Sequence, residues 1–148
     1  MTTSHAGYDL TPLPADRINA LAAQFTPEER KVILHQGTEP AFCGTLLDNK
    51  QAGTYVCRLC GLPLFASNAK FESGTGWPSF FRPFDPDHVK NLEDHSHGMR
   101  RVEIRCARCD AHLGHVFDDG PAPTRLRYCL NSISMEFVPE GQPIALRS

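Results

Sequence analysis

The sequence predicts a mainly β domain with a short helical segment at its N-terminus. From about residue 53 the chain consists of short β-branched and aromatic runs, interrupted by Gly, Pro, Asn and Asp. Residues 1–37 instead place apolar side chains at helical spacing. With 148 residues, 41% hydrophobic and 22% charged, the chain predicts a single globular domain at 1–148, large enough for one hydrophobic core.

Two short helices are expected in the N-terminal segment, which we regard as an appendage packed on the outside of the β domain. The first covers PADRINALAAQ, residues 14–24, where Ile18, Leu21 and Ala22 fall on one helical face.

The second helix is expected within TPEERKVILHQG, residues 26–37. Thr26 is a good N-cap, Pro27 suits the first helical position, and Glu29 completes a capping box. Gly37 is the expected stop.

The strand candidates follow in the second half of the chain. The residue 132–138 segment nearly alternates polar and apolar residues, as a half-buried strand does. Residues 73–89 are too rich in Gly and Pro for regular structure, and their aromatic residues predict close packing. The clearest strand candidates are TYVCRLC (54–60), MRRVEIRC (99–106), LGHVFDD (113–119) and RYCLNSISMEFVP (127–139).

Charge and hydropathy disfavour two classes of partner. The formal net charge is −2, with 15 Lys and Arg against 17 Asp and Glu, which gives no electrostatic reason to expect nucleic acid. No apolar run approaches the length that crosses a bilayer. The N-terminus lacks the basic and apolar regions of a secretory signal, so a cytoplasmic protein is expected.

Four of the six cysteines form two CxxC pairs, Cys57 with Cys60 and Cys106 with Cys109. In a reducing compartment, doubled CxxC pairs are typical of a tetrahedral four-cysteine zinc site. Such a site has no open coordination position, so we expect one structural Zn²⁺ that clamps two distant hairpins. A redox-active CxxC and simple buried thiols are the alternatives.

Cys129, within RLRYCLNS, has no cysteine neighbour in the sequence. Lone cysteines are more often small core residues than nucleophiles. In a strand, however, Arg127 would share a face with Cys129, and its guanidinium would favour the thiolate. Arg127 could equally be a solvated surface residue.

The segment AHLGHVFDDGP, residues 111–121, adds titratable groups just before Cys129. His112 and His115 could move protons for a thiol at neutral pH, with Asp118 and Asp119 beside them. Alternatively, the histidines could bind metal, although four thiolates already fill the proposed site, or Asp119 could simply cap the turn.

Several longer motifs, in this order, resemble the B-type family of peptide methionine-R-sulfoxide reductases. The similarity runs from about residue 26 to 139, which is therefore the expected core. The motifs are GTEPAFCGTLLDNK (37–50), GTYVCRLCGLPLFASNAKFESGTGWPSFFRP (53–83), GMRRVEIRCARCDAHLGHVFDDGPAPTRLRYCLNS (98–132) and SMEFVP (134–139).

The resemblance implies a fold of two small antiparallel sheets in a barrel-like or tent-like arrangement, with a structural zinc between two CxxC knuckles. It also implies an oxidoreductase that converts methionine-R-sulfoxide in proteins and peptides to methionine. Cys129 matches the family's nucleophile, which attacks the sulfoxide sulfur and becomes a sulfenic acid.

By similarity, the remaining polar residues would assist this thiol. His115, with His112 and Asp119 nearby, would supply a proton and hold water at the sulfoxide oxygen. Arg127 and Asn131 would shape the charge around the sulfur. Trp77 would form an apolar wall for the substrate methyl group, although a tryptophan here could also be an ordinary core residue.

One position departs from the family pattern. Many relatives carry a resolving cysteine in the loop before GWPSF, where this chain has Thr75. We therefore expect Cys43 to form the disulfide with Cys129, which thioredoxin then reduces. A rearrangement of residues 38–48 could be needed to bring the two sulfurs together. The competing interpretation is that Cys43 is a bystander and an external thiol reduces Cys129 directly.

Two other functions fit part of the sequence. A zinc-knuckle binding module explains the four paired cysteines but leaves Cys129, Trp77 and the histidines unused. A zinc hydrolase would need an open metal site and additional ligands. The proposed reductase is expected to be a monomer.

Overall fold

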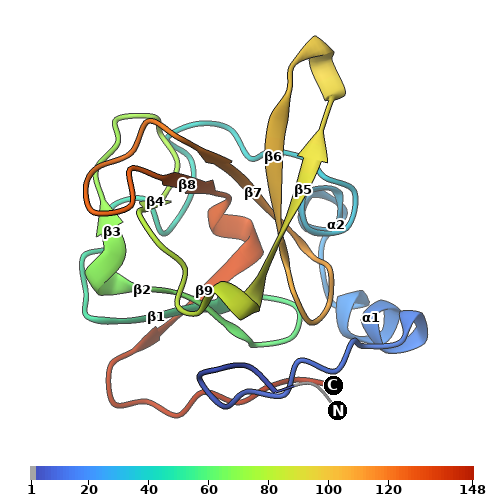
Figure 1. Cartoon of the computed structure of the whole chain (residues 1–148). Helices are drawn as coiled ribbons and strands as arrows, with labels where there is room; N and C mark the ends of the chain where they lie inside the picture. Colours follow the sequence, from blue (N-terminus) through green and yellow to red (C-terminus); the bar gives the residue numbers. More distant parts are fainter. Residues whose placement is uncertain (1–2) are drawn as a thin grey trace.

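The computed structural model describes residues 3–148, apart from the side chain of His97. Within these residues the strands form two antiparallel sheets (Figure 1). In spatial order, the three-stranded sheet contains β2 (Pro63–Ala66), β1 (Gly53–Cys57) and β9 (Met135–Pro139). The six-stranded sheet contains β3 (Lys70–Phe71), β4 (Ser79–Phe80), β8 (Arg127–Leu130), β7 (His112–Phe117), β6 (Arg101–Cys106) and β5 (Val89–Asp94).

The predicted class, mainly β with two antiparallel sheets and short N-terminal helices, is confirmed. The two sheets meet through buried aromatic rings. Phe65 of β2 stacks on Phe80 of β4 with ring centroids 4.7 Å apart, and Tyr55 of β1 contacts Phe80 edge-on at 5.0 Å. Phe65 also approaches Tyr128 of β8 at 5.6 Å. Each ring contributes roughly 1.5–3 kcal/mol by burial, so these contacts fix the six-stranded sheet over the other.

The N-terminal helices are α1 (Ala15–Ala22) and α2 (Pro27–Ile33). The predicted capping box is present: the Glu29 backbone N–H donates to Thr26 Oγ1, and the Thr26 N–H donates to Glu29 Oε1. Val32 and Ile33 of α2 are buried, so this helix packs against the β domain. Neither helix in residues 3–148 has the length and apolar character of a membrane span.

The expected helix stop at Gly37 is wrong, because α2 already ends at Ile33. The chain turns through Gln36, whose φ is +62°, and the Gly37 N–H donates to the Lys31 carbonyl at 2.8 Å. A Cβ at Gly37 would lie 2.9 Å from that carbonyl oxygen. Glycine is needed here for close packing of backbone on the helix end, several residues beyond the stop.

The predicted continuous strand over 132–138 is also wrong. Residues Ser132–Ser134 form a 3₁₀ turn, η4, and β9 begins only at Met135. The Ser134 N–H donates to Asn131 O, and its hydroxyl donates to His112 O at 2.8 Å. Polar contacts of Ser134, one to Asn131 and one to β7, therefore override the alternation that predicted a strand.

Some regular structure lies where none was expected. Within residues 73–89, β4 pairs with both β3 and β8, and Pro86–His88 form a 3₁₀ turn. The edge strand β5 was missed because its sequence, VKNLED, is largely polar. It pairs along its whole length with β6, and Figure 1 shows this hairpin extending away from the rest of the molecule.

Candidate active site and metal site

Strand register places Cys129 in a row of polar residues on one face of the six-stranded sheet. Cys129 of β8 lies opposite Ser79 of β4 on one side and opposite His115 of β7 on the other. Glu103 of β6 lies opposite His115. Because side chains of directly paired residues point to the same face, one cross-strand row carries these groups together.

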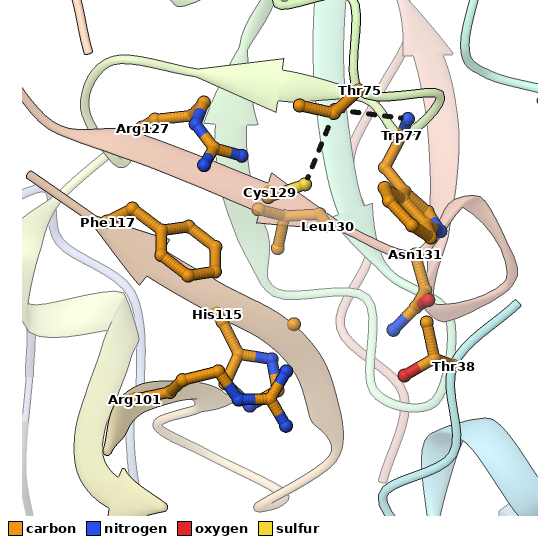
Figure 2. Close-up of a pocket in the computed structure, with 11 residues that line it drawn as sticks. Thr38, Thr75, Trp77, Arg101, His115, Phe117, Arg127, Cys129, Leu130 and Asn131 are labelled. Carbon is orange, nitrogen blue, oxygen red and sulfur yellow. Dashed lines mark hydrogen bonds between the residues drawn. The ribbon is translucent and has the colours of Figure 1, made fainter. Parts of the chain in front are cut away.

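The half-buried Cys129 opens onto a cavity of about 280 Å³ (Figure 2). Strands β7 and β8 form its floor, and the loop before β4 forms one wall. The lining residues are Thr38, Thr75, Trp77, Arg101, Gly114, His115, Phe117, Arg127, Cys129, Leu130 and Asn131. The cavity is of a size that holds a side chain.

Hydroxyl groups surround the Cys129 sulfur. Thr75 Oγ1 lies 3.7 Å from Cys129 Sγ, and Ser73 Oγ joins Thr75 Oγ1 at 2.8 Å and Ser79 Oγ at 2.7 Å. Burial raises the pKa of the Cys129 thiol, and hydrogen bonding from Thr75 together with the charge of Arg127 offsets only part of that effect. The thiolate that the sequence led us to expect is therefore not the favoured form of the resting protein at neutral pH.

Arg127 is held beside the thiol by two contacts. Its Nε and Nη2 donate to the two Asp119 carboxylate oxygens at 2.9 and 3.2 Å, and its guanidinium lies 4.4 Å from the centre of the Phe117 ring. Asp119 itself is 62% exposed in its side chain and does not line the cavity. Its position suits orienting Arg127, whereas the sequence led us to expect it near the substrate oxygen.

His115 lines the cavity and is oriented by a carboxylate. Its Nε2 lies 2.7 Å from Asp94 Oδ2 at the end of β5. The Ser96 backbone N–H and the His115 ring both hold the pKa of Asp94 well below its usual range, so Asp94 is ionised. Arg101 donates to the same Asp94 oxygen at 3.3 Å. The ionised carboxylate fixes the orientation of the imidazole ring.

His112 occupies a different place from the one expected. It is buried, it does not line the cavity, and its ring packs edge-on behind His115 with centroids 5.6 Å apart. Its Nδ1 contacts Glu103 Oε2 at 2.7 Å. Burial lowers the pKa of His112, although Glu103 acts in the opposite direction. The neutral ring therefore supports His115 from behind.

Trp77 and Asn131 form two further parts of the cavity wall, and both bind the same residue. The Trp77 indole N–H donates to the Glu39 carbonyl at 2.9 Å. The Glu39 backbone N–H donates to Asn131 Oδ1 at 3.0 Å, while Asn131 Nδ2 donates to Leu113 O at 3.2 Å. The Asn131 side chain thus binds backbone groups of two other segments, at Glu39 and at Leu113.

The close approach of β7 to β8 depends on Gly114. A Cβ at this position would collide with the Cys129 carbonyl oxygen and approach Leu130 Cα to 3.0 Å. Only glycine lets the two backbones approach this closely directly behind the nucleophile candidate.

Cys43 is exposed and does not line the cavity. Its loop is nevertheless attached to the cavity wall, because the Phe42 N–H donates to the Gly76 carbonyl at 2.7 Å. Phe42 has a φ of +64° and is 69% exposed. A strained, exposed segment one residue before Cys43 is suited to rearrangement.

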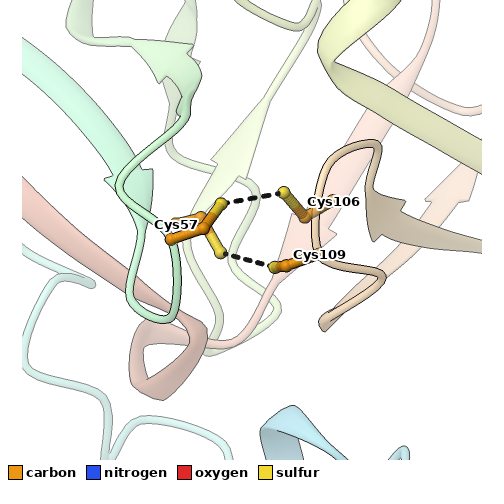
Figure 3. A group of neighbouring side chains, drawn as sticks. Cys57, Cys106 and Cys109 are labelled. Atoms are coloured by element: carbon orange, nitrogen blue, oxygen red, sulfur yellow. Dashed lines mark hydrogen bonds between the residues drawn. The ribbon is translucent and has the colours of Figure 1, made fainter. Parts of the chain in front are cut away.

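The four paired cysteines converge, as predicted. Their sulfur atoms all lie within 4.8 Å of one another, and all four residues are buried (Figure 3). Cys57 Sγ lies 3.5 Å from Cys109 Sγ, and Cys60 Sγ lies 3.6 Å from Cys106 Sγ. Tetrahedral Zn–S bonds of about 2.3 Å would give sulfur separations of roughly 3.8 Å. The donor set therefore fits a thiolate-bound metal ion.

The two knuckles have the same backbone design. The Gly61 N–H donates to Cys57 O, and the Asp110 N–H donates to Cys106 O, at 2.8 and 2.9 Å. Gly61 and Asp110 both have positive φ, +81° and +67°. Each pair of cysteines is therefore followed by a residue in the left-handed backbone conformation, which glycine and aspartate tolerate.

The C-terminal segment covers this metal site. The Arg147 guanidinium donates to the carbonyls of Cys57, Arg58 and Leu59, and its backbone N–H donates to Cys60 O at 2.7 Å. The buried Arg108 of the second knuckle donates to Cys60 O and to Arg147 O. Two guanidinium groups thus link both knuckles to the end of the chain.

Comparisons with known proteins agree with this fold and site. Residues 25–139 match the model of the SelR domain. The chain belongs to this family. A relative from Caulobacter vibrioides, 61% identical over 97% of this chain and 90% of its own length, is named peptide methionine sulfoxide reductase MsrB.

Relatives with the same name come from other bacteria. One from Xylella fastidiosa is 60% identical over 90% of this chain and 86% of its own length. One from Acinetobacter baumannii is 57% identical over 76% of this chain and 81% of its own length. The similarity to MsrB proteins therefore extends over most of the chain.

Sequence reasoning missed several residues of the site. Asp94 and Arg101 lie on the two strands of a hairpin whose first strand was not predicted, so no signal connected them with His115. Thr75 was noted only as a missing cysteine, yet it contacts the Cys129 sulfur. Glu39 lies within the motif GTEPAFCGTLLDNK, but the sequence did not indicate that its side chain is buried.

Proposed function

We propose that this protein reduces methionine-R-sulfoxide in proteins and peptides to methionine, with Cys129 as the nucleophile. The observation that carries this proposal is the cavity in which a half-buried thiol shares a sheet face with a carboxylate-bound imidazole. A thiol reacts with a sulfoxide only if a proton donor activates the oxygen. The name of the MsrB relatives supports methionine sulfoxide as the substrate.

The chemistry transfers one oxygen atom from the substrate to the enzyme. Cys129 first loses its thiol proton, and the thiolate then attacks the sulfoxide sulfur while the oxygen gains a proton, so the two proton changes cancel. The oxygen ends on the cysteine as a sulfenic acid, and methionine leaves, so Cys129 is oxidised by two electrons and the substrate is reduced by two. His115 is the proposed proton donor, because it lines the cavity opposite Cys129 and Asp94 fixes the orientation of its ring. Arg127 stabilises the attacking sulfur, and Asp119 orients Arg127.

The choice of the R epimer follows from three simultaneous contacts. The substrate sulfur faces Cys129, its oxygen points toward His115, and its methyl group lies against the Trp77 indole. All three side chains line the same cavity. The S epimer would exchange the methyl group and the oxygen, which places a polar atom against the indole and leaves the proton donor without a partner.

Cys43 is the proposed resolving thiol. Its attack on the Cys129 sulfenic acid would form a disulfide and release water, and thioredoxin would then reduce the disulfide by thiol exchange. The exposed position of Cys43 and the attachment of its loop to Gly76, next to Trp77, support this role.

The proposed metal is one structural Zn²⁺ per chain, held by Cys57, Cys60, Cys106 and Cys109. When bound, it would join the end of β1 to the end of β6 and so connect the two sheets. The four thiolates leave no position for a substrate.

The central experiment measures reduction of separated R and S sulfoxide peptides, driven by dithiothreitol or by thioredoxin. The R peptide should be reduced with both reductants and the S peptide with neither. Cys129→Ser should lose activity and keep about one zinc per chain. Equal reduction of both epimers, or an active Cys129→Ser protein, would contradict the proposal.

The role of Cys43 needs a separate measurement. Cys43→Ser should lose thioredoxin-driven turnover while dithiothreitol-driven turnover remains, and mass spectrometry of the oxidised wild-type protein should find a Cys43–Cys129 disulfide. Thr45→Ala, an exposed change in the same loop, is the matched control. Unchanged thioredoxin-driven turnover in Cys43→Ser would instead favour direct reduction of Cys129.

A further inference from the structure

Glu39 is a buried carboxylate within an otherwise exposed stretch of chain. Its residue exposure is 3%, whereas its neighbours Thr38 and Pro40 are exposed. Side chains of this type are rarely buried without a specific set of partners. The loop that carries Glu39 follows α2 and also carries Cys43.

Three hydrogen bonds tie Glu39 to segments on either side of Cys129. Its backbone carbonyl accepts from the Trp77 indole N–H at 2.9 Å, and its backbone N–H donates to Asn131 Oδ1 at 3.0 Å. Its carboxylate Oε1 accepts from the Ile133 N–H at 2.9 Å. Trp77 precedes β4, and the other two residues follow β8, so Glu39 connects the segments next to the two strands that carry Ser79 and Cys129.

The second carboxylate oxygen is enclosed by the same loop. Among the described residues, Glu39 Oε2 is buried and has no hydrogen-bond partner. A Cβ at Gly44 would collide with Glu39 Oε2 and with Ser132 Oγ. The Leu46 N–H donates to Ser132 Oγ at 3.2 Å, which keeps the chain folded back over the carboxylate. The absence of a side chain at Gly44 is therefore necessary for this arrangement.

We propose that Glu39 is a positioning residue that sets the orientation of Trp77 and Asn131, two walls of the cavity, and thereby controls substrate affinity. The inference rests on the proposed function and deepens it. Glu39 does not line the cavity, so it acts through these two side chains. Anchoring of its carboxylate to Ile133 fixes the backbone groups that bind the indole and the amide.

This role predicts an effect on binding more than on chemistry. Glu39→Ala removes the acceptor of a buried N–H group, so the loop should loosen, and KM for an R sulfoxide peptide should rise roughly tenfold or more. The value of kcat should change less, because Cys129 and His115 keep their strand positions. Glu39→Gln retains an acceptor oxygen for Ile133 and should stay close to wild type in KM.

Fluorescence gives a readout that does not require turnover. Trp77 is the single tryptophan of the chain, so intrinsic emission reports on this indole alone. Glu39→Ala should shift the emission to the red and increase quenching by acrylamide in the absence of substrate. In a Cys129→Ser background, a fluorescence titration with the same peptide should show a matching loss of affinity.

Two further variants keep the test decisive. Gly44→Ala should displace the carboxylate without removing it, and it should give the same direction of change; it replaces Glu39→Ala if that protein does not fold. Glu28→Ala, an exposed glutamate on α2, is the matched control for loss of charge and size.

A folded Glu39→Ala protein with unchanged KM and unchanged Trp77 quenching would overturn the inference. Loss of kcat alone, with KM and quenching unchanged, would overturn it as well. An inactive wild-type protein would instead contradict the proposed function.

Discussion

His115 and Cys129 lie directly opposite each other on β7 and β8, so the imidazole and the thiol share one face of the sheet. The strands fix this pairing, and the Asp94 contact at 2.7 Å fixes the ring. The proton donor and the nucleophile of the proposed reaction are thus held by backbone register.

Substitution of His115 and of its partner Asp94 should slow the proposed oxygen transfer to different extents. His115→Gln should lower the rate of sulfenic acid formation by about 10²-fold or more, because a positioned general acid contributes on that scale. Asp94→Asn should have a smaller effect in the same direction. Stopped-flow measurement under single-turnover conditions checks both. His95→Gln, an exposed histidine after β5, is the control, and a comparable loss in that variant would count against the assignment.

Thr75 should lower the pKa of the Cys129 thiol. Loss of its hydroxyl in Thr75→Val removes a hydrogen bond to the sulfur, so the pKa should rise further above its ordinary value. A higher pKa means less thiolate at any given pH, and the pH profile of alkylation by iodoacetamide should therefore move to higher pH. A Cys43→Ser background prevents labelling of the exposed thiol. Thr75→Ser should restore the wild-type profile, and an unshifted Thr75→Val profile would contradict the prediction.

Arg147 should slow the release of metal. Arg147→Ala removes donors from three carbonyls of the first knuckle, and loss of such supporting hydrogen bonds typically costs 10–100-fold in metal affinity. Zinc transfer to a chromogenic chelator should accelerate by about tenfold or more. Arg100→Ala removes an exposed guanidinium from the β5–β6 hairpin and should leave the transfer rate unchanged. Equal rates in both variants would argue against a role for the C-terminal segment.

Protonation of His112 should destabilise the fold. Burial lowers the pKa of His112 in the folded protein, so the unfolded chain binds more protons below about pH 6.5. The free energy of unfolding should fall as the pH drops through that value, toward the lower pKa of the folded state, and this contribution should be fully present above it. Urea unfolding at pH 7.5 and 5.5 measures the loss.

The matched comparison for this pH effect uses two variants. His112→Asn should lose less stability than wild type between the two pH values, whereas His35→Asn, at an exposed histidine, should follow wild type. Metal release at low pH affects all three proteins, so only their differences report on His112. A His112→Asn protein with the wild-type pH dependence would refute the prediction.

Local patterns in the sequence predicted the features that depend on local chemistry. The capping box at Thr26 and Glu29 and the two cysteine knuckles follow from residue types at fixed spacing, and the structure confirms their geometry. Helix ends and strand breaks were less predictable. Gly37 packs its backbone on the end of α2 at Lys31, and Ser134 donates to a strand distant in sequence.

The composition of the active cavity was only partly accessible from sequence. Arg127 and Cys129 were expected on one face because of strand periodicity, and both line the cavity. His112 is buried and Asp119 is exposed because of the way neighbouring segments pack around each residue. Local residue patterns in one sequence do not predict this packing. The monomeric state, the cytoplasmic location and the single-domain assignment stay predictions.

The missing side chain at Gly114 has a consequence for how this site can vary. The Cys129 carbonyl occupies the space that a methyl group at residue 114 would need, so any other amino acid would push β7 and β8 apart and lift the sulfur out of line with His115. Substitutions on the rim of the cavity can change which sulfoxide-bearing peptide is preferred. At residue 114, by contrast, only glycine is compatible with the pairing of β7 and β8.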